Sequence, residues 1–454
     1  MVNIIIKKSY RSAVFLSFLM PSLAGLFLFV TPVSYEGSLS IPVAILSSTL
    51  QSVLKEYLPA TITTIVVMVA IITVISKFAK LAFVNNSNFL SGIFDVSPLW
   101  CLTRVAGAVF IVESYFQIGS LAVWSEETGG MMLNDLLPVL FCIFIVAGLL
   151  LPLVMNFGLL ELAGTLCTRV MRPVFNLPGR SAIDCIASWL GDGSVGILMT
   201  SKQYESGLYT QREAAVIGST FSTVSITFSF VVIAQVGLQH LFALLFLTIF
   251  LAGIVAAIIV PRLPPLSWKK DIFINGQPRS PEADIIPEGW NSFSWGMQRA
   301  LEKAEGVKSP VSVVKDGIKN AADMVFGVIP VVMGIGTIAL IVAKYTPIFT
   351  YLGMPFVPLL ELLRIPEATQ ASTAMVVGFT DMFVPSILAS SIQSEMTRFV
   401  IAAVSLTQLI YLSEIGALLL SSKIPIVIWE LFVIFILRTL VTLPIIAGIA
   451  HLFF

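Results

Sequence analysis

Two segments of the chain decide how the rest of it is interpreted. Residues 177–211 read LPGRSAIDCIASWLGDGSVGILMTSKQYESGLYTQ, and residues 365–397 read IPEATQASTAMVVGFTDMFVPSILASSIQSEMT. Each is partly apolar and is interrupted near its centre by Gly, Asp, Ser or Pro, so neither suits a plain membrane-spanning helix of about 20 apolar residues. Each follows an apolar stretch of spanning length and precedes a long apolar helix that carries Ser, Thr or Gln. We therefore expect a broken helical hairpin at each segment.

The two segments align as an internal repeat with a shift of about 186–188 residues. The alignment pairs Pro178 with Pro366, Arg212 with Arg398 and Ser219 with Ser405. Lys and Arg concentrate in cytoplasmic loops, which places the N-terminus and the segment 262–319 in the cytoplasm. The first repeat then enters the membrane from outside and the second from inside. Inverted repeats with broken helices are typical of secondary transporters.

The composition indicates a polytopic membrane protein. Of the 454 residues, 57% are hydrophobic and 11% are charged, whereas a soluble chain carries about 25% charged residues. Lys+Arg and Asp+Glu both number 26, so no net positive charge favours nucleic acid. The chain contains neither HExxH nor GxxxxGK[ST], which argues against a zinc hydrolase and against ATP-driven transport. We expect no enzymatic activity and no cofactor other than Na⁺.

Apolar runs with few or no charged residues predict the membrane spans. These are residues 12–35, 57–76, 104–121, 136–160, 214–261 (two helices that turn near 235–239), 324–343, 399–420 and 426–447. The predicted organisation is a scaffold (1–135), a first repeat (136–261, hairpin 177–211), a cytoplasmic linker (262–319) and a second inverted repeat (320–454, hairpin 365–397). The expected fold class is an all-α polytopic membrane protein in which each repeat has a re-entrant hairpin and a polar-striped transmembrane helix.

The hairpin tips and the polar stripes are the predicted binding site. Irregular backbone is tolerated in a bilayer only where it lines a cavity or is buried in protein, and charges at depth are usually functional. The candidate substrate-binding residues at the tips are Gly191, Asp192, Gly193, Ser194, Thr380 and Asp381. The candidates on the following helices are Ser222, Thr223, Gln408, Tyr411 and Glu414. A Na⁺ site is expected near Ser219, Ser225 and Ser405.

Each of these residues also has a structural interpretation. Hydroxyl groups on membrane helices commonly serve helix packing or bond back to a carbonyl of the preceding turn. Asp192 and Asp381 would then cap free N–H groups of the hairpins. Glu414 would form a buried ion pair with Arg438.

Residues 189–229, which begin WLGDGSVGILMTSKQYESGLYTQ, resemble the YjiH-like family of bacterial inner-membrane proteins, which carries the nucleoside-recognition (Gate) domain. Gate domains are shared with concentrative nucleoside transporters, ferrous-iron transporters and spore maturation proteins. The resemblance covers residues 136–261 and, more weakly, 324–454. It implies two re-entrant hairpins, two unwound or polar-striped helices, cation coupling and a homo-oligomer, either a dimer or a trimer. The chain has Gly-Asp-Gly-Ser where the nucleoside transporters carry Gln-Thr-Glu, so nucleoside specificity does not follow from it.

The leading hypothesis is a secondary active transporter of a small polar solute, driven by Na⁺ or H⁺. The solute is a nucleoside, an amino acid or a short peptide. We expect a multi-pass protein of the bacterial inner membrane, with a cytoplasmic N-terminus, in contact with lipids and not with nucleic acid. One alternative is a non-transporting scaffold or regulator that keeps the Gate fold for assembly. Another is an ion or metal permease, with Cys185 and Met199 as pore candidates.

Overall fold

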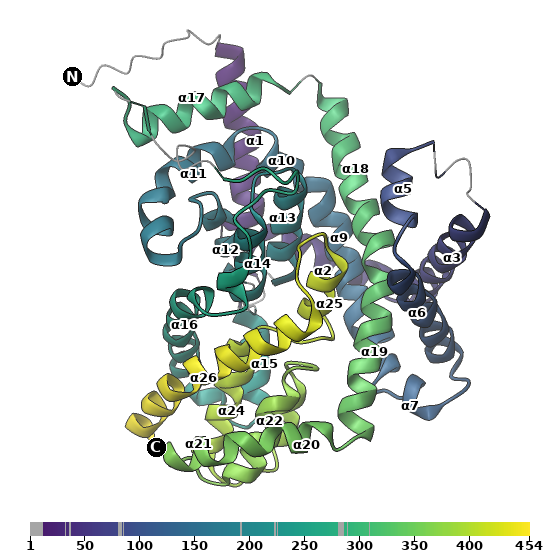
Figure 1. Cartoon of the computed structure of the whole chain (residues 1–454), viewed down its shortest axis with the longest axis vertical. Coiled ribbons are helices and arrows are strands. Elements are labelled where there is room, and N and C mark those ends of the chain that lie inside the picture. The colour runs from purple at the N-terminus through teal and green to yellow at the C-terminus, as the bar shows by residue number, and fades with distance from the viewer. Residues whose placement is uncertain are drawn as a thin grey trace.

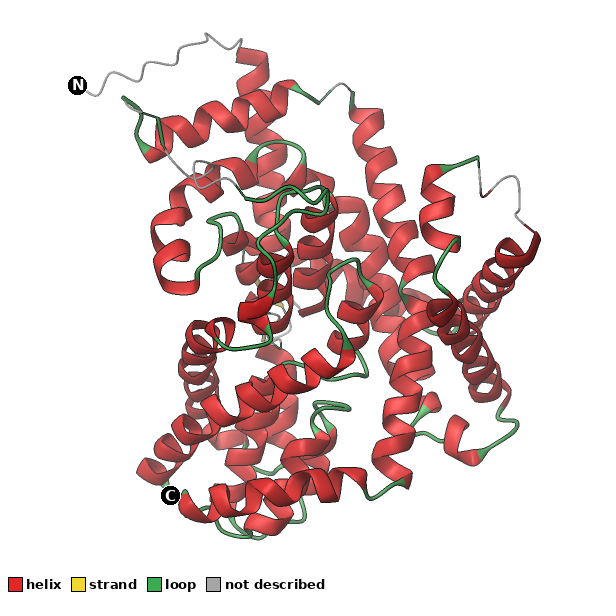
Figure 2. Cartoon of the chain, viewed as in Figure 1, coloured by secondary structure: helices red, strands yellow, loops and turns green. Residues whose placement is uncertain are grey.

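The chain is almost entirely helical (Figure 2). The structure, a computed structural model, describes residues 12–31, 33–35, 38–79, 84, 86–190, 193–221, 224, 226–279, 286–287, 289–307 and 309–454. One short antiparallel pair, β1 (Val33–Tyr35) and β2 (Ser38–Ser40), follows the first helix. The helices of the first half are α1 (Ser12–Val30), α2 (Pro42–Leu54), α3 (Leu58–Ala79), α5 (Asn88–Phe94), α6 (Pro98–Phe116), α7 (Leu121–Trp124), α8 (Gly129–Met131), α9 (Leu137–Leu150), α10 (Pro152–Met155), α11 (Leu159–Val170), α12 (Ser181–Leu190), α13 (Gly193–Glu205), α14 (Gln211–Thr220), α15 (Ile226–Gln235) and α16 (Phe242–Ile259). Those of the second are α17 (Ser292–Glu305), α18 (Pro310–Gly327), α19 (Ile329–Tyr345), α20 (Ile348–Gly353), α21 (Val357–Leu362), α22 (Ala368–Val377), α23 (Val384–Ala389), α24 (Glu395–Gln408), α25 (Ile415–Ser421) and α26 (Ile428–Phe453).

Seven helical stretches within these described residues are long and apolar enough to cross a membrane. They are Ser12–Val30, Leu58–Phe78, Pro98–Phe116, Leu121–Met155, Gln239–Arg262, Pro310–Tyr345 and Ile428–Phe453. The predicted class of all-α multi-pass membrane protein is therefore confirmed.

Two predicted spans begin too late because a charged residue was taken as a boundary. The prediction started the third span at Arg104, but α6 begins at Pro98. The Arg104 guanidinium is buried and donates to Thr73 Oγ1 at 3.1 Å and to the Ile93 carbonyl at 2.7 Å, so the helix carries this charge without exposing it to lipid. Similarly, the helical stretch predicted from residue 324 starts at Pro310.

The long helices pack side by side around one apolar core (Figure 1). The α18–α19 pair runs the length of the molecule, from the end that carries α17 to the end that carries α20, and α3, α5, α6 and α7 lie on its outer side. Helix α19 packs on α6, and α18 packs on α9. Where α6 and α19 cross, a Cβ atom on Gly107 would lie 2.2 Å from the Pro330 carbonyl oxygen, so the two backbones are in direct contact. Helix α17 packs on α11 and α1 through Phe18, Ala300 and Leu301.

The same order of elements occurs twice along the chain. A long helical stretch (Leu121–Met155 or Pro310–Tyr345) is followed by short helices and by two helices that pack together as a hairpin. The hairpins are α12–α13 and α22–α23. Next comes a helix that breaks in its middle, α14–α15 or α24–α25, and then a long closing helix, α16 or α26.

The prediction of a single helix over residues 399–420 is wrong. Helix α24 ends at Gln408, Leu409 adopts a left-handed conformation with φ of 60°, and α25 begins only at Ile415. The polar residues in this break, Tyr411, Ser413 and Glu414, were interpreted as the polar stripe of a continuous helix, so the prediction did not show the break. The predicted turn near 235–239 is confirmed, since α15 ends at Gln235 and α16 follows.

Candidate functional site

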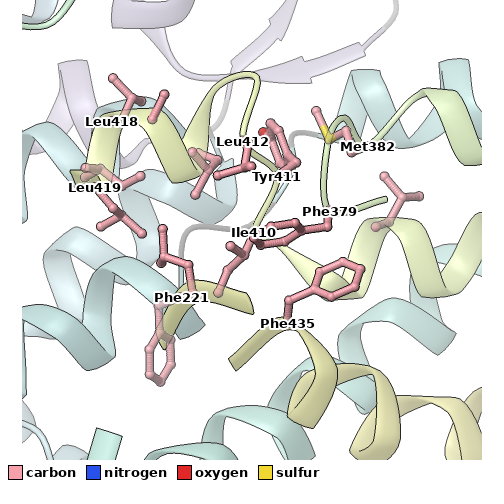
Figure 3. Packing of buried hydrophobic residues seen from close by; sticks show 14 of the residues in the cluster. Phe221, Phe379, Met382, Ile410, Tyr411, Leu412, Leu418, Leu419 and Phe435 are labelled. Carbon is pink, nitrogen blue, oxygen red and sulfur yellow. The ribbon is translucent and has the colours of Figure 1, made fainter. Parts of the chain in front are cut away.

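The breaks of two helical elements meet in the second half of the chain. The segment between α22 and α23 lies against the segment between α24 and α25. The Leu412 N–H donates to the Phe379 carbonyl and the Ser413 N–H to the Thr380 carbonyl, both at 2.8 Å. Figure 3 shows Phe379 beside Tyr411 and near Phe435, whose ring centroid is 5.3 Å away. Each break therefore satisfies backbone groups that the other exposes.

Asp381 lies in this crossing and is buried. Its Oδ1 accepts the N–H groups of Phe383 at 2.8 Å and Val384 at 3.3 Å, and its Oδ2 accepts the Ser413 hydroxyl at 2.8 Å. The carboxylate thus caps the start of α23 and also joins the hairpin to the broken helix. The neighbouring Thr380 hydroxyl donates to the Val377 carbonyl within its own turn.

The other predicted residues of the second half surround the same crossing. The Gln408 amide Nε2 donates to the Met375 carbonyl at 3.1 Å and to Thr439 Oγ1 at 2.8 Å. Its Oε1 is buried and has no hydrogen-bond partner within the described chain. The Tyr411 hydroxyl donates to Glu414 Oε2 at 3.3 Å. The structure therefore brings Thr380, Asp381, Gln408, Tyr411 and Glu414 together.

Arg438 links the second half to the first. It is fully buried in α26, where its Nε donates to the Thr407 carbonyl at 2.9 Å and its Nη1 to the Thr220 carbonyl at 3.3 Å. Thr407 and Thr220 lie at the C-terminal ends of α24 and α14, where helix dipoles present partial negative charge. The expected ion pair with Glu414 is wrong for the part of the chain that the structure describes, because the guanidinium binds helix ends instead.

Much of the predicted first-half site lies outside the described residues, namely Gly191, Asp192, Ser222, Thr223 and Ser225. The described remainder is Gly193 and Ser194, which are buried at the start of α13.

The two described serines of the expected Na⁺ site use their hydroxyls locally. Ser219 Oγ donates to the Ala215 carbonyl at 2.6 Å, and Ser405 Oγ donates to the Ala402 carbonyl at 2.9 Å. No group of three His, Cys, Asp or Glu side chains able to hold a metal ion occurs among the described residues.

The sequence analysis missed Asp184, the buried acid of the first hairpin. It accepts hydrogen bonds from Thr200 Oγ1 at 3.0 Å, Gln203 Nε2 at 2.6 Å and Tyr209 Oη at 2.9 Å. These bonds join α12 to α13 and to the turn after it. An aspartate within an apolar hairpin was the reason for predicting Asp381, and the same reason applies to Asp184. In the first hairpin, however, the Gly-rich tip at residues 191–194 was predicted as the site instead.

A cavity of about 220 Å³ lies among α5, α6, α13, the α18–α19 pair and α25. Hydroxyl groups and charged side chains line it, among them Ser194, Ser201, Arg104, Glu205 and Asp323. The Lys202 amine, next to its wall, pairs with Glu205 at 3.2 Å and with Asp323. These ionic residues were also missed, because their positions at the ends of apolar runs resemble those of ordinary loop residues.

The chain is similar to a known domain family and to a known bacterial protein. The Gate family, described as nucleoside recognition, matches residues 137–239, which include the first hairpin and the broken helix α14–α15. An uncharacterized protein of Alkalihalophilus pseudofirmus is 52% identical over 439 residues, which are 97% of this chain and 95% of that protein. No solved structure matches the chain significantly. The chain therefore belongs to the same family as this relative and carries the Gate nucleoside-recognition domain.

Proposed function

We propose that the protein is a secondary active transporter of a small polar solute, driven by Na⁺ or H⁺. The observation that carries this proposal is the crossing of two broken helical elements around buried Asp381. A bilayer penalises irregular backbone unless it lines a cavity or is buried in protein, so two breaks at one place need a reason beyond packing. In secondary transporters, discontinuous helices supply the ligands for solute and coupling ion.

The polar groups at the crossing suit a solute with several hydrogen-bonding groups. Glu414 and Asp381 supply acceptors or protonatable carboxyls, and Gln408 Oε1 is an acceptor that no described donor satisfies. A buried acceptor without a donor costs about 1–3 kcal/mol, which a bound N–H or O–H group would recover. A neutral or zwitterionic solute such as an amino acid, short peptide or nucleoside fits this chemistry.

The cavity beside Ser194 is a suitable access route from one side. Its volume of about 220 Å³ is below the roughly 300–1,000 Å³ of drug-sized sites, so it suits a small solute. The repeated element order supports inverted repeats with re-entrant hairpins, in which one repeat assembly moves relative to the other. We place the protein in the bacterial inner membrane, with a cytoplasmic N-terminus, as a dimer or trimer.

The test is a thermal-shift screen of the purified full-length protein. Nucleosides, amino acids and dipeptides are tested with Na⁺ and with K⁺, and at both acidic and neutral pH. A ligand at about 100 times its Kd stabilises the folded state by roughly 2.7 kcal/mol, which raises the melting temperature measurably. We expect a saturable hit that Na⁺ or H⁺ strengthens and that Glu414→Gln removes. Glu395→Gln, on the exposed first turn of α24, is the matched control.

Uptake into proteoliposomes then separates transport from binding. An imposed Na⁺ or pH gradient should drive accumulation of the solute found in the screen. A flat screen together with no gradient-driven uptake contradicts the proposal and favours the scaffold alternative.

A further inference from the structure

A second cavity, of about 320 Å³, lies between the linker helix α17 and the base of the first hairpin. Five arginines line it, against two glutamates: Arg169, Arg172, Arg180, Arg279 and Arg299, with Glu161 and Glu213. Among the described residues of the wall, arginines therefore outnumber glutamates. Segments far apart in the sequence supply these charges, from α11 to α17. Arginine clusters of this kind bind anions.

Part of this positive charge is not neutralised by the acids in the wall. Arg172 and Arg279 both pair with Glu213, the former at 3.0 Å. Arg180, in contrast, approaches Glu161 only at 3.8 Å, and its Nη1 is buried without a hydrogen-bond partner in the described chain. A buried guanidinium N–H with no acceptor is the group that an anionic ligand would satisfy.

Two further arginines of the wall have no acidic partner. Within the residues that the structure describes, neither Arg169 nor Arg299 forms an ion pair. Arg169 is exposed at the rim, and Arg299 is partly buried on α17 beside Trp295. The excess charge is thus available from both the hairpin side and the linker side of the cavity.

The backbone fixes the position of Arg180. A Cβ atom on Gly179 would lie 1.9 Å from the Gly164 carbonyl oxygen and 2.5 Å from the Thr168 backbone nitrogen. The loop before α12 therefore packs directly on α11, and only glycine allows this approach. This contact fixes the backbone from which the Arg180 side chain extends toward the cavity.

We propose that this cavity binds a phosphate-bearing anion, which joins α17 to the base of the first hairpin. A phosphate monoester carries about −1.5 to −2 charges at neutral pH, whereas a single carboxylate carries one, so the phosphate matches the guanidinium groups of Arg169, Arg180 and Arg299 better. Its oxygens also accept paired N–H groups from the planar guanidinium fork. The phosphate comes either from a free metabolite or from a lipid headgroup. Since Arg180 immediately precedes α12, such a ligand couples the linker to the position of the hairpin.

The experiment uses the full chain in detergent and in nanodiscs. Melting temperature is measured against inorganic phosphate, AMP and adenosine at constant ionic strength, and in phosphatidylcholine nanodiscs with and without phosphatidic acid. We expect a saturable increase with phosphate or AMP, or with phosphatidic acid, that depends on Arg299, whereas any shift that adenosine gives at the proposed transport site should not depend on Arg299. Arg299→Gln should weaken binding about tenfold. Lys303→Gln removes the same charge from the exposed face of α17 and should change binding by less than about twofold.

The arms of this experiment identify the source of the phosphate. A response to phosphate or AMP in detergent indicates a free metabolite, and a response confined to phosphatidic acid indicates a lipid headgroup. If Arg299→Gln does not fold, Arg169→Gln at the exposed rim takes its place. The proposal is overturned if none of the phosphate-bearing probes shifts the melting temperature, or if Lys303→Gln weakens binding as much as the cavity variants do.

Discussion

The two hairpins each bury one described aspartate that accepts three hydrogen bonds, but they place it differently. In the first hairpin, Asp184 lies near the base, and three side chains of the same hairpin and its following turn donate to it. In the second, Asp381 lies at the break itself, where two backbone N–H groups and Ser413 donate to it. Ser413 belongs to a different element, the break between α24 and α25.

This difference separates a residue that holds one element together from a residue that joins two. The partners of Asp184 move with it if the hairpin moves as a unit. The bond between Asp381 and Ser413 crosses a contact between elements, so any motion of the hairpin relative to the broken helix must break or rearrange it. We infer that Asp184 mainly supports the fold, and that Asp381 is the aspartate coupled to the proposed transport.

The largest expected effect is on stability, from Asp184→Ala. This variant removes the acceptor of three buried donors, including the Gln203 amide and the Tyr209 hydroxyl, and should destabilise the protein by about 4 kcal/mol. Asp381→Ala should cost about half as much, because two of its donors are N–H groups at a helix start, which water or a neighbour satisfies more easily. Equilibrium unfolding in mixed micelles measures both. Equal losses would contradict the distinction between the two aspartates.

The next effect concerns the contact between the halves. Arg438→Met leaves two helix-end carbonyls without their donor, at Thr220 and Thr407, and also removes a buried charge that is costly to desolvate. The net loss should be about 2–3 kcal/mol in the same unfolding measurement. The control is Arg212→Met, which loses one long bond of 3.4 Å to the Pro261 carbonyl and should cost less than about 1 kcal/mol. If Arg438→Met loses less unfolding free energy than the control, Arg438 does not link the two broken helices α14–α15 and α24–α25.

The membrane class and most helices could be predicted because apolar runs of spanning length are typical of membrane-spanning helices. Even the hairpins were visible as partly apolar segments broken by Gly, Asp and Pro. What failed was the treatment of buried charge: Arg104 was taken as a boundary, although its guanidinium is buried and donates hydrogen bonds to Thr73 and Ile93. The break after Gln408 was also missed, because the polar residues Tyr411, Ser413 and Glu414 were interpreted as one face of a continuous helix.

The candidate site was predictable where polar residues interrupt an apolar segment, as Thr380 and Asp381 do at the second hairpin. Gln408, Tyr411 and Glu414 were found from one polar stripe. Asp184 and Arg438 act through residues far along the chain, and spacing alone does not show such contacts.

A third prediction compares charge removal at the two aspartates. Asn has nearly the shape of Asp and is an equally good cap, so Asp381→Asn should fold, yet it should lower solute uptake into proteoliposomes by about tenfold or more because no carboxylate remains to take a cation or proton. Asp184→Asn should leave uptake within about twofold, because the Thr200 and Tyr209 hydroxyls can rotate to accept from the new amide. If both variants lose uptake equally while folding normally, Asp184 takes part in transport as well.

The smallest expected effect concerns how tightly each hairpin is packed. A Cβ atom on Gly196 in the first hairpin would lie 2.7 Å from Ser188 Cβ, which is tied to the facing backbone. A Cβ atom on Gly378 in the second hairpin would lie 2.4 Å from Gln408 Oε1, an atom at the end of a flexible side chain. Gly196→Ala should therefore destabilise the protein by about 1 kcal/mol more than Gly378→Ala, in the range that overpacking usually costs.

The neutral reference for this pair is Gly448→Ala in α26, where nothing lies within 4 Å of the added methyl group. It should leave stability unchanged or raise it by up to about 1 kcal/mol, because alanine favours the helix. Gly378→Ala should in addition weaken solute binding relative to Gly448→Ala, since the methyl group displaces the Gln408 amide. A Gly378→Ala protein that binds the solute normally would show that Gln408 is only a packing contact. The crossing in the second half would then differ from the first hairpin in geometry but not in role.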